Sequence, residues 1–288
     1  MKMKINRMNF DILEEIEGTL IHHGPVNNRV YFMDFKYNDF DKIITNVNRL
    51  ANKKKYDKII GKVPESGLQQ FLVKGFKVEA KIPNLFKDAT GYFISEYLNK
   101  KREYCSLNTV KIIESVKKIA LAATLDNQNE SLPLAYDLRK LKSKDLERLS
   151  DLNKLSFKTY AFPICEIEYL KECLQNNYEF YGAYKDSKLV ISAMVKIDKK
   201  ESNAEVIDFA IHPNYRGQNL SFYVMNKIKE AIIEKGLNTL YAMVRSTSYG
   251  LNITFAKQGF IPGGTLINNT LVENSLENMN VWYLNLNK

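Results

Sequence analysis

A single stretch of the chain, residues 204–221, combines side chains that could activate an amine with a loop suited to phosphate. It reads AEVIDFAIHPNYRGQNLS, and its apolar pattern predicts a strand that carries Glu205 and Asp208. A carboxylate within reach of an ammonium group, directly or through water, could take its proton. The two acids are three residues apart, so a regular strand would point them to opposite faces, whereas a bulge would bring both to one face. Both acids are therefore candidate general bases.

The strand is followed by the hexapeptide RGQNLS (Arg216–Ser221), which would open the next helix. Backbone N–H groups at the start of a helix have no partner within the helix and attract phosphate. Small residues such as Gly217 would let these groups approach a pyrophosphate. Asn219 tolerates a left-handed backbone and Ser221 is small, so we expect this loop to bind phosphate.

The histidines and cysteines do not form a recognisable metal site or nucleophile pair. His22 and His23 are adjacent in the sequence, so on a strand their rings point apart, and no third ligand is evident. We interpret His212 as a loop residue. Cys165 and Cys173 lack an evident histidine partner, and we interpret them as small buried apolar groups. We therefore expect no metal ion.

Two segments of the chain resemble each other and predict an internal repeat. Residues 68–76 (LQQFLVKGF) and 252–260 (NITFAKQGF) share the pattern F-x-x-x-G-F. Each follows a β-like stretch, an amphipathic helix and, before that, a strand, which is VYFMDF (30–35) in one copy and AEVIDFAI (204–211) in the other. We expect each copy to fold as strand, helix, strand, short helix and strand.

The second copy has additional predicted elements in front of it. They are a strand at 135–141, a helix at 143–157, a short helix at 166–175 and three strands that end with 204–211. An apolar helix at 108–124 precedes the polar run at 126–131, which we interpret as the break between the halves. The expected domains are 1–125, a degenerate half, and 131–288, the catalytic half.

Composition excludes several classes of protein. The 288 residues are 45% hydrophobic and 26% charged, as in globular proteins, and no apolar run approaches the ~18 residues that a membrane helix needs. The first ten residues, MKMKINRMNF, do not resemble a secretory signal. The three cysteines, including Cys105, show no CxxC spacing. We expect a reduced cytoplasmic protein with no membrane partner.

The net charge of +9 does not by itself predict a nucleic-acid partner. The lysines are scattered, and the densest run, Lys53–Lys55, closes a predicted helix where cations suit the helix dipole. No stretch interleaves basic and aromatic residues as a nucleic-acid surface would. We expect no nucleic-acid partner, although a phosphate-bearing cosubstrate could use part of the charge.

The order of elements in 135–288 resembles the GNAT acetyltransferase fold. In that family a loop of form R/Q-x-x-G-x-G/A joins a strand to a helix; here Asn219 stands where the second Gly is usual and Ser221 where Gly or Ala is usual. Further segments are similar to the β-lysine N-acetyltransferases of this superfamily, over nearly the whole chain. They are HHGPVNNRVY (22–31), KVP (62–64), YAFPI (160–164), GGTLINNT (263–270) and MNVWY (279–283).

The resemblance implies a mixed-sheet α/β protein, a GNAT fold preceded by a truncated GNAT-like half. It implies transfer of acetyl from acetyl-CoA, without a metal, to the terminal amine of β-lysine, giving a compatible solute for osmoadaptation. It places the base at Glu205 first. The implied site residues are Glu205, Asp208 and Tyr249 for catalysis; Phe209, Ala210, Ile211, Arg216, Gly217, Gln218, Asn219, Leu220, Ser221, Asn252 and Phe255 for acetyl-CoA; and Arg29, Tyr160, Phe162, Asn268 and Asn269 for the amine substrate.

Several alternatives stay open at this stage. The family often takes its general acid from a tyrosine where this chain has Phe255, so Tyr241, Tyr249 and Tyr283 are substitutes, and the thiolate could also leave without help. The substrate could be another small amine such as lysine or a polyamine, or the protein could be a CoA-binding regulator without catalysis. A homodimer is left open. The N-terminal half lacks a phosphate loop, and it either contributes Arg29 to a substrate carboxylate or is a structural cap.

Overall fold

The computed structural model describes residues 10–35, 39–123, 135–158 and 160–286, which fall into two compact units. Unit 1 comprises residues up to Val110 together with 160–162 and 263–279, and unit 2 comprises the remainder. The predicted break at 126–131 lies outside the described residues. Within the described ranges, no helix is both long and apolar enough to cross a membrane.

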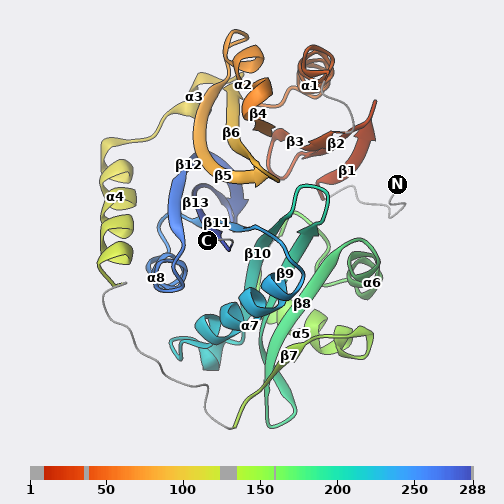
Figure 1. The fold of residues 1–288 in the computed structure, drawn as a ribbon, viewed down its shortest axis with the longest axis vertical. Coiled ribbons are helices and arrows are strands. Elements are labelled where there is room, and N and C mark those ends of the chain that lie inside the picture. Colours follow the sequence, from red (N-terminus) through yellow and green to blue (C-terminus); the bar gives the residue numbers. More distant parts are fainter. Residues whose placement is uncertain (1–9, 36–38, 124–134, 159, 287–288) are drawn as a thin grey trace. The chain divides into compact units, whose positions relative to one another are not determined.

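Unit 1 is built on a sheet with the strand order β1-β2-β3-β4-β6-β5-β12 (Figure 1). Its elements are β1 (Ile12–Ile16), β2 (Thr19–Gly24), β3 (Arg29–Phe35), α1 (Phe40–Lys54), β4 (Lys58–Pro64), α2 (Glu65–Leu72), β5 (Lys77–Phe86), β6 (Ala89–Tyr97) and α3 (Lys100–Glu103). Helix α1 forms because Ile43, Ile44 and Val47 recur at helical spacing and are buried. Asp39 caps its first turn by accepting from the N–H of Lys42 at 3.1 Å.

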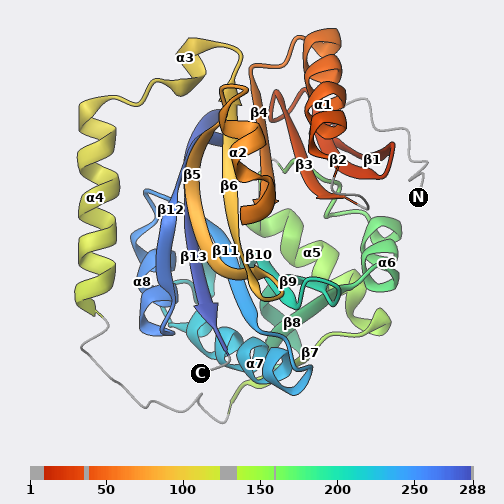
Figure 2. The ribbon, with the colours of Figure 1, turned by 45° about the horizontal axis from the view of Figure 1, so that its top comes forward.

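Unit 2 has the strand order β13-β11-β10-β9-β8-β7, with helices on both faces (Figure 2). Its elements are β7 (Asp137–Lys140), η2 (Ser143–Asp145), α5 (Leu146–Ser156), α6 (Ile167–Gln175), β8 (Tyr178–Lys185), β9 (Lys188–Asp198), β10 (Asn203–Ile211), η3 (Pro213–Tyr215), α7 (Leu220–Glu234), β11 (Thr239–Arg245) and α8 (Tyr249–Lys257). Helix α4 (Leu107–Ala122) and strands β12 (Ile261–Val272) and β13 (Ser275–Asn285) contribute residues to both units.

The internal repeat predicted from the F-x-x-x-G-F motif is confirmed by the topology. In unit 1, β3 pairs in parallel with β4, and in unit 2, β10 pairs in parallel with β11. Each ladder has four pairs, running from Arg29↔Lys58 in one and from Asn203↔Thr239 in the other. The helix between the paired strands is α1 in one copy and α7 in the other.

The two motifs also share their local geometry. The N–H of Phe76 bonds to the carbonyl of Phe71 at 3.2 Å, and that of Phe260 bonds to Phe255 at 3.1 Å. The intervening Gly75 and Gly259 have φ of +97° and +84°, a left-handed backbone that ends each short helix at glycine. The two phenylalanine rings meet edge to face in both copies.

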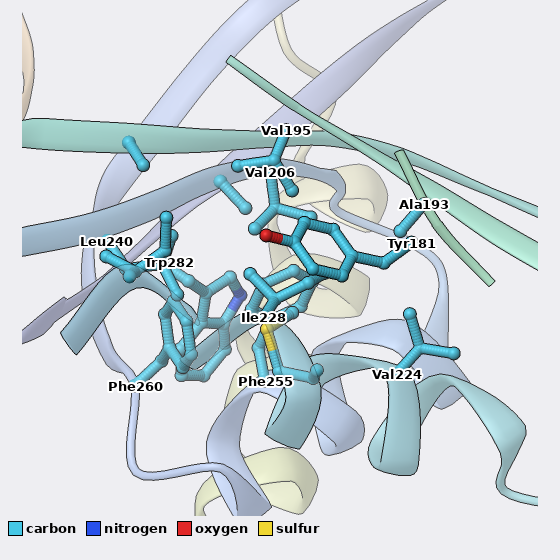
Figure 3. Packing of buried hydrophobic residues seen from close by; sticks show 14 of the residues in the cluster. Tyr181, Ala193, Val195, Val206, Val224, Ile228, Leu240, Phe255, Phe260 and Trp282 are labelled. Carbon is cyan, nitrogen blue, oxygen red and sulfur yellow. The ribbon is translucent and has the colours of Figure 1, made fainter. Parts of the chain in front are cut away.

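The core of unit 2 lies between α7, α8 and one face of the sheet (Figure 3). Val224 and Ile228 of α7 are fully buried there, as are Ala193 and Val195 of β9. Trp282, the single tryptophan of the chain, is also fully buried in this cluster. The packing fixes α7 against the sheet, and so it fixes the loop that leads into this helix.

Candidate active site

Glu205 and Asp208 face the same side of the sheet because β10 contains a bulge. Strand β10 pairs with β9, but the register shifts between Val206 and Asp208, where Ile207 is the extra residue. Glu205 stands opposite Lys196, and Asp208 stands opposite Met194. Since alternate residues of β9 share a face and opposed residues point the same way, the two carboxylates lie on one face. The bulge that would bring Glu205 and Asp208 to one face is therefore present.

The face that carries Asp208 is covered by α5 and α6. Asp208 lines a narrow pocket together with residues of these helices and of the neighbouring strands, namely Leu149, Asn153, Ile164, Leu170, Phe180, Ser192 and Met194. Most of these residues are apolar, whereas the opposite face of β10 packs into the core under α7. Asp208 is only partly buried and has interactions of its own.

The parallel ladder between β10 and β11 ends at the bulge. Among the described residues, paired positions join these strands from Asn203↔Thr239 only as far as Val206↔Ala242. Both strands nevertheless continue, to Ile211 and to Arg245. Residues 207–211 of β10 therefore have no ladder partner on the edge that faces β11. An extended ligand with amide groups could form hydrogen bonds to this edge in the way that an additional strand would. Phe209, Ala210 and Ile211, the predicted acetyl-CoA contacts, lie along it.

Glu205 is held by a tyrosine on the neighbouring strand. Tyr241 lies directly opposite Glu205 in the ladder, and its hydroxyl donates to Oε2 of Glu205 at 2.9 Å. Both side chains are buried, with 4% of Glu205 and 1% of Tyr241 exposed. Tyr178 is half-buried, and desolvation, followed by the charges of Cys173 and Glu205, raises the pKa of its phenol.

The loop before α7 has the features of a phosphate site. Gly217 has φ of +76° and Asn219 has φ of +54°, so the left-handed backbone predicted at Asn219 is present. A Cβ added to Gly217 would meet nothing within 4 Å, which leaves space for a ligand at this backbone. Helix α7 has no side-chain cap and no acid in its first turn, so its N-terminal N–H groups are available to an anion.

Other residues of the loop differ in exposure. Arg216 is exposed, while Leu220 and Ser221 are buried at the start of α7. Gln218 accepts a hydrogen bond from the hydroxyl of Tyr136 at 2.8 Å, which ties the loop to the residue before β7. Ser221 contacts Thr254 of α8 through their hydroxyls at 3.3 Å, so a small residue at 221 allows α7 and α8 to approach.

The residues predicted on α8 differ in their surroundings. Asn252 is fully buried and its amide is used internally: it donates to the carbonyls of Arg245 and Ser248 and accepts from Asn280 and Trp282. It therefore fixes the end of β11 against α8 and β13. Its predicted contact with acetyl-CoA stays a prediction.

Phe255 and Tyr249, also on α8, have opposite exposures. Phe255 is buried and packs edge to face on Phe209 of β10, with ring centroids 6.3 Å apart, so the predicted contacts Phe209 and Phe255 touch each other. Tyr249 is 45% exposed at the start of the helix. Its catalytic role stays a prediction.

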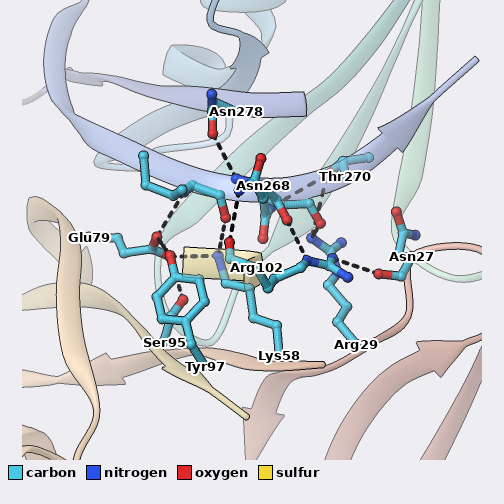
Figure 4. Close-up of polar contacts among 12 residues, drawn as sticks. Asn27, Arg29, Lys58, Glu79, Ser95, Tyr97, Arg102, Asn268, Thr270 and Asn278 are labelled. Carbon is cyan, nitrogen blue, oxygen red and sulfur yellow. Dashed lines mark hydrogen bonds and ion pairs between the residues drawn. The ribbon is translucent and has the colours of Figure 1, made fainter. Parts of the chain in front are cut away.

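The residues predicted to bind the amine are all in unit 1. Arg29 is buried on β3, and its Nη1 donates to the carbonyl of Asn269 (Figure 4). Asn268 donates from its side chain to the carbonyls of Arg102 and Tyr104, at 2.8 and 2.9 Å. These residues hold segment 263–279 within unit 1.

Tyr160 and Phe162 belong to the short segment between α5 and α6 that joins unit 1. The ring of Phe162 stacks on His22 of β2 at 4.5 Å, and the carbonyl of Ala161 accepts from the N–H of Asp11 at 3.1 Å. The predicted substrate contacts of Tyr160 and Phe162 stay predictions.

The structure gives the surroundings of the histidines and cysteines that the sequence analysis considered. His23 bonds to Tyr56 and Glu14, and His212 accepts from the N–H of Asn214. Cys173 is buried as predicted, whereas Cys165, also predicted to be buried, is only partly buried, as is Cys105; all three are free thiols. Within the described part of the chain, no group of three or more His, Cys, Asp or Glu side chains could hold a metal ion.

Two features of the site were not anticipated from the sequence. The pairing of Tyr241 with Glu205 could have been found only by aligning β10 with β11, because 36 residues separate them. The hairpin of β1 and β2 also extends the repeat upstream of VYFMDF. The turn residues Glu17-Gly18 were the available signal.

An edge of β10 without ladder partners, a bulge that puts two carboxylates on one face and an uncapped helix start suit transfer of an acyl group from a CoA thioester. Residues 146–260 match the family model described as Acetyltransferase (GNAT) family. The chain is an N-acetyltransferase that uses acetyl-CoA as cosubstrate.

Curated relatives match nearly the whole chain, including unit 1. The β-lysine N(6)-acetyltransferase of Methanococcus maripaludis is 29% identical over 271 residues, which cover 93% of this chain and 97% of the relative. That of Methanosarcina mazei is 25% identical, covering 87% and 98%. The N-acetyltransferase YodP of Bacillus subtilis is 24% identical, covering 91% and 94%. The resemblance to β-lysine N-acetyltransferases is thus confirmed.

Proposed function

We propose that this chain transfers an acetyl group from acetyl-CoA to the terminal amine of β-lysine. The observation that carries the proposal is the full-length similarity to two β-lysine N(6)-acetyltransferases, which extends through unit 1 as well as the acetyltransferase domain. Similarity confined to the acetyl-CoA-binding half would not indicate which amine receives the acetyl group. The unpaired edge of β10, the loop before α7 and the buried Glu205 are consistent with acetyl transfer.

The amine must lose a proton before it attacks the thioester. A lysine-type amine has a pKa near 10.4, so only about one molecule in 10³ is free base at neutral pH. We propose that Glu205 takes that proton, directly or through water, while Tyr241 donates to its Oε2. Asp208 is on the same face and is the second candidate base.

Acetyl-CoA would be held by the unpaired edge of β10 and by the loop before α7. The N–H groups of residues 217–221 would contact its pyrophosphate, and the unpaired edge of β10 at 209–211 would contact the amides of its pantetheine arm. When bound, acetyl-CoA supplies the activated acetyl group. An N–H on that edge could also steady the negative charge that develops on the carbonyl oxygen.

We also propose the finer aspects of the function. The product has one charged amine fewer than β-lysine, which suits a compatible solute that accumulates under osmotic stress. The enzyme would act in the cytoplasm, where acetyl-CoA is made, and a homodimer is the assembly we would test first. Arg29, Tyr160, Phe162, Asn268 and Asn269 are proposed to contact the amine substrate, and Tyr249 to serve as the general acid.

The substrate is tested by presenting three amines side by side. The purified protein is incubated with acetyl-CoA and with β-lysine, α-lysine or spermidine, and each product is quantified by mass spectrometry. We expect the highest kcat/KM with β-lysine. A preference for spermidine would make the chain a polyamine acetyltransferase, and acetyl-CoA binding without transfer to any amine would make it a CoA-binding regulator.

A further inference from the structure

The pocket beside Asp208, under α5 and α6, is lined by five apolar and three polar residues. The polar residues are Asn153, Ser192 and Asp208. All eight residues belong to unit 2, so the pocket lies within one compact unit. Its cavity measures about 10 Å³, which is room for a single water molecule but not for the side chain of a substrate.

Ser192 brings a buried hydroxyl to this pocket. The residue lies within β9 and is only 2% exposed. Its hydroxyl has no hydrogen-bond partner among the residues that the structure describes. Buried hydroxyl groups in proteins normally have a partner, either a protein group or an ordered water. Because the cavity adjoins Ser192, a water molecule there would supply that partner.

Asn153 of α5 has its amide orientation fixed by a hydrogen bond. Its Nδ2 donates to the carbonyl of Ile164 at 2.7 Å, and its side chain is buried. The other end of the amide, Oδ1, is therefore an acceptor. An acceptor beside a water-sized cavity calls for a donor, which a water molecule also provides.

Asp208 shares a face of the sheet with Ser192. Ser192 and Met194 are alternate residues of β9, and Asp208 stands opposite Met194. A carboxylate has two oxygens and can accept several hydrogen bonds, so one bond from a water is compatible with the other interactions of Asp208.

A water molecule matches these three groups in number and in kind. It would donate one O–H to Oδ1 of Asn153 and the other to the carboxylate of Asp208, and it would accept from the hydroxyl of Ser192. Three hydrogen bonds are the usual number for a buried water. Because the cavity has the volume of one water, the groups that line it can reach the same molecule.

We propose that one buried water joins Asp208 to Ser192 and Asn153, and that these two residues position the carboxylate of Asp208 for acetyl transfer. The inference rests on the proposed function, in which Asp208 is a candidate base, and deepens it by naming the residues behind that carboxylate. A functional side chain needs its rotamer fixed by packing and by supporting hydrogen bonds. A water anchored on β9 and α5 adds such a support.

The water itself is tested by crystallography of the full chain. A high-resolution structure of the wild type should show one ordered water within hydrogen-bonding distance of Oγ of Ser192, Oδ1 of Asn153 and the carboxylate of Asp208. In Ser192→Val the added methyl groups occupy the cavity, and the water should be absent. A wild-type cavity without a water, or a water that does not contact Asp208, would overturn the proposal.

The positioning role is tested by the kinetics of β-lysine acetylation. Ser192→Ala removes the hydroxyl with little change in volume, and kcat should fall about three- to tenfold, as for one lost hydrogen bond, while the KM for acetyl-CoA is unchanged. Ser150→Ala is the matched control, because Ser150 is also 2% exposed but its hydroxyl donates to the carbonyl of Cys165 at 2.6 Å, away from the pocket. Its kcat should stay near the wild-type value, and an equal fall in both variants would count against a specific role of Ser192.

A double-mutant cycle with Asp208→Asn separates positioning from a purely structural effect. If Ser192 acts through Asp208, Ser192→Ala should have little effect on kcat in the Asp208→Asn background, where the carboxylate to be positioned is gone. Equal factors in both backgrounds would overturn the proposal while leaving acetylation of β-lysine intact. Absence of transfer by the wild type would instead refute the proposed function itself.

Discussion

Tyr31 of β3 and Glu205 of β10 occupy equivalent positions in the two copies of the repeat. Each residue is the third of the four parallel pairs, opposite Ile60 in one case and Tyr241 in the other. Each is also followed by a bulge, at Met33 and at Ile207, and then by an aspartate. The bulge is therefore a property of both copies, and the carboxylate at the third pair is what distinguishes the acetyltransferase copy.

Replacing Glu205 by Gln should lower kcat for acetyl transfer by about 100-fold at neutral pH, the span usual for a lost general base. The loss should diminish at high pH, where free amine accumulates without help. Measurement of kcat from pH 6.5 to 10 checks this. Asp208→Asn serves as the comparison on the same face, and a larger loss in that variant would assign the base to Asp208.

Removing the hydroxyl that holds Glu205 should slow acetyl transfer without abolishing it. In Tyr241→Phe the carboxylate loses the donor that holds its Oε2. We expect kcat to fall by a smaller factor than in Glu205→Gln, with acetyl-CoA affinity unchanged in calorimetry. A loss of kcat as large as in Glu205→Gln would instead support Tyr241 as a proton donor.

The phosphate loop can be tested with a glycine pair. Gly217→Asp should weaken acetyl-CoA binding at least tenfold in calorimetry, because it places a side chain and a negative charge beside the pyrophosphate. Gly236→Asp is the matched control, since Gly236 also has a positive φ, +67°, and open space around its Cβ position, but lies at the other end of α7. Equal losses in both variants would attribute the effect to backbone strain.

The buried pair of Lys58 and Glu79 predicts a pH-dependent stability. Burial lowers the pKa of Lys58 to about 8, against about 10.4 in an unfolded chain. Between these values the unfolded chain binds more protons, so the contribution of Lys58 to the free energy of unfolding rises with pH. From pH 8 to 9.5 the rise should be about 1–2 kcal/mol.

Urea denaturation of the wild type and of Lys58→Met/Glu79→Gln at both pH values measures that rise. Circular dichroism is the appropriate signal, because Trp282, the single tryptophan, belongs to unit 2. The double variant should lack the rise. A parallel pH dependence of both proteins would refute the assignment to this pair.

Much of the acetyltransferase half follows from local sequence signals. The strand with Glu205, the loop at Arg216–Ser221 and the following helix were all predicted, because apolar periodicity and turn residues are read over short distances. The repeat was predicted from F-x-x-x-G-F, because the left-handed glycine and the two packed rings need those residues at that spacing.

The remaining features depend on contacts between distant residues. A bulge at Ile207 has no sequence signal, because the residue is an ordinary β-former and the register is set by the neighbouring strand. The donors to β12 are equally hidden, since Lys58 and Arg102 are residue types usually exposed, and only the fold brings them to the carbonyls of Ile267 and Asn268. Arg29 was predicted as a substrate contact, but its bond to Asn269 was not.

The most direct test of the central claim is the position of the acetyl group on the product. β-Lysine is incubated with the protein and acetyl-CoA labelled with ¹³C in the acetyl carbonyl, and the product is examined by two-dimensional NMR for the nitrogen and carbon neighbours of the label. We predict that the labelled carbonyl is attached to the terminal nitrogen alone. A label on the internal nitrogen, or no labelled product under conditions where acetyl-CoA binds, would contradict the proposed function.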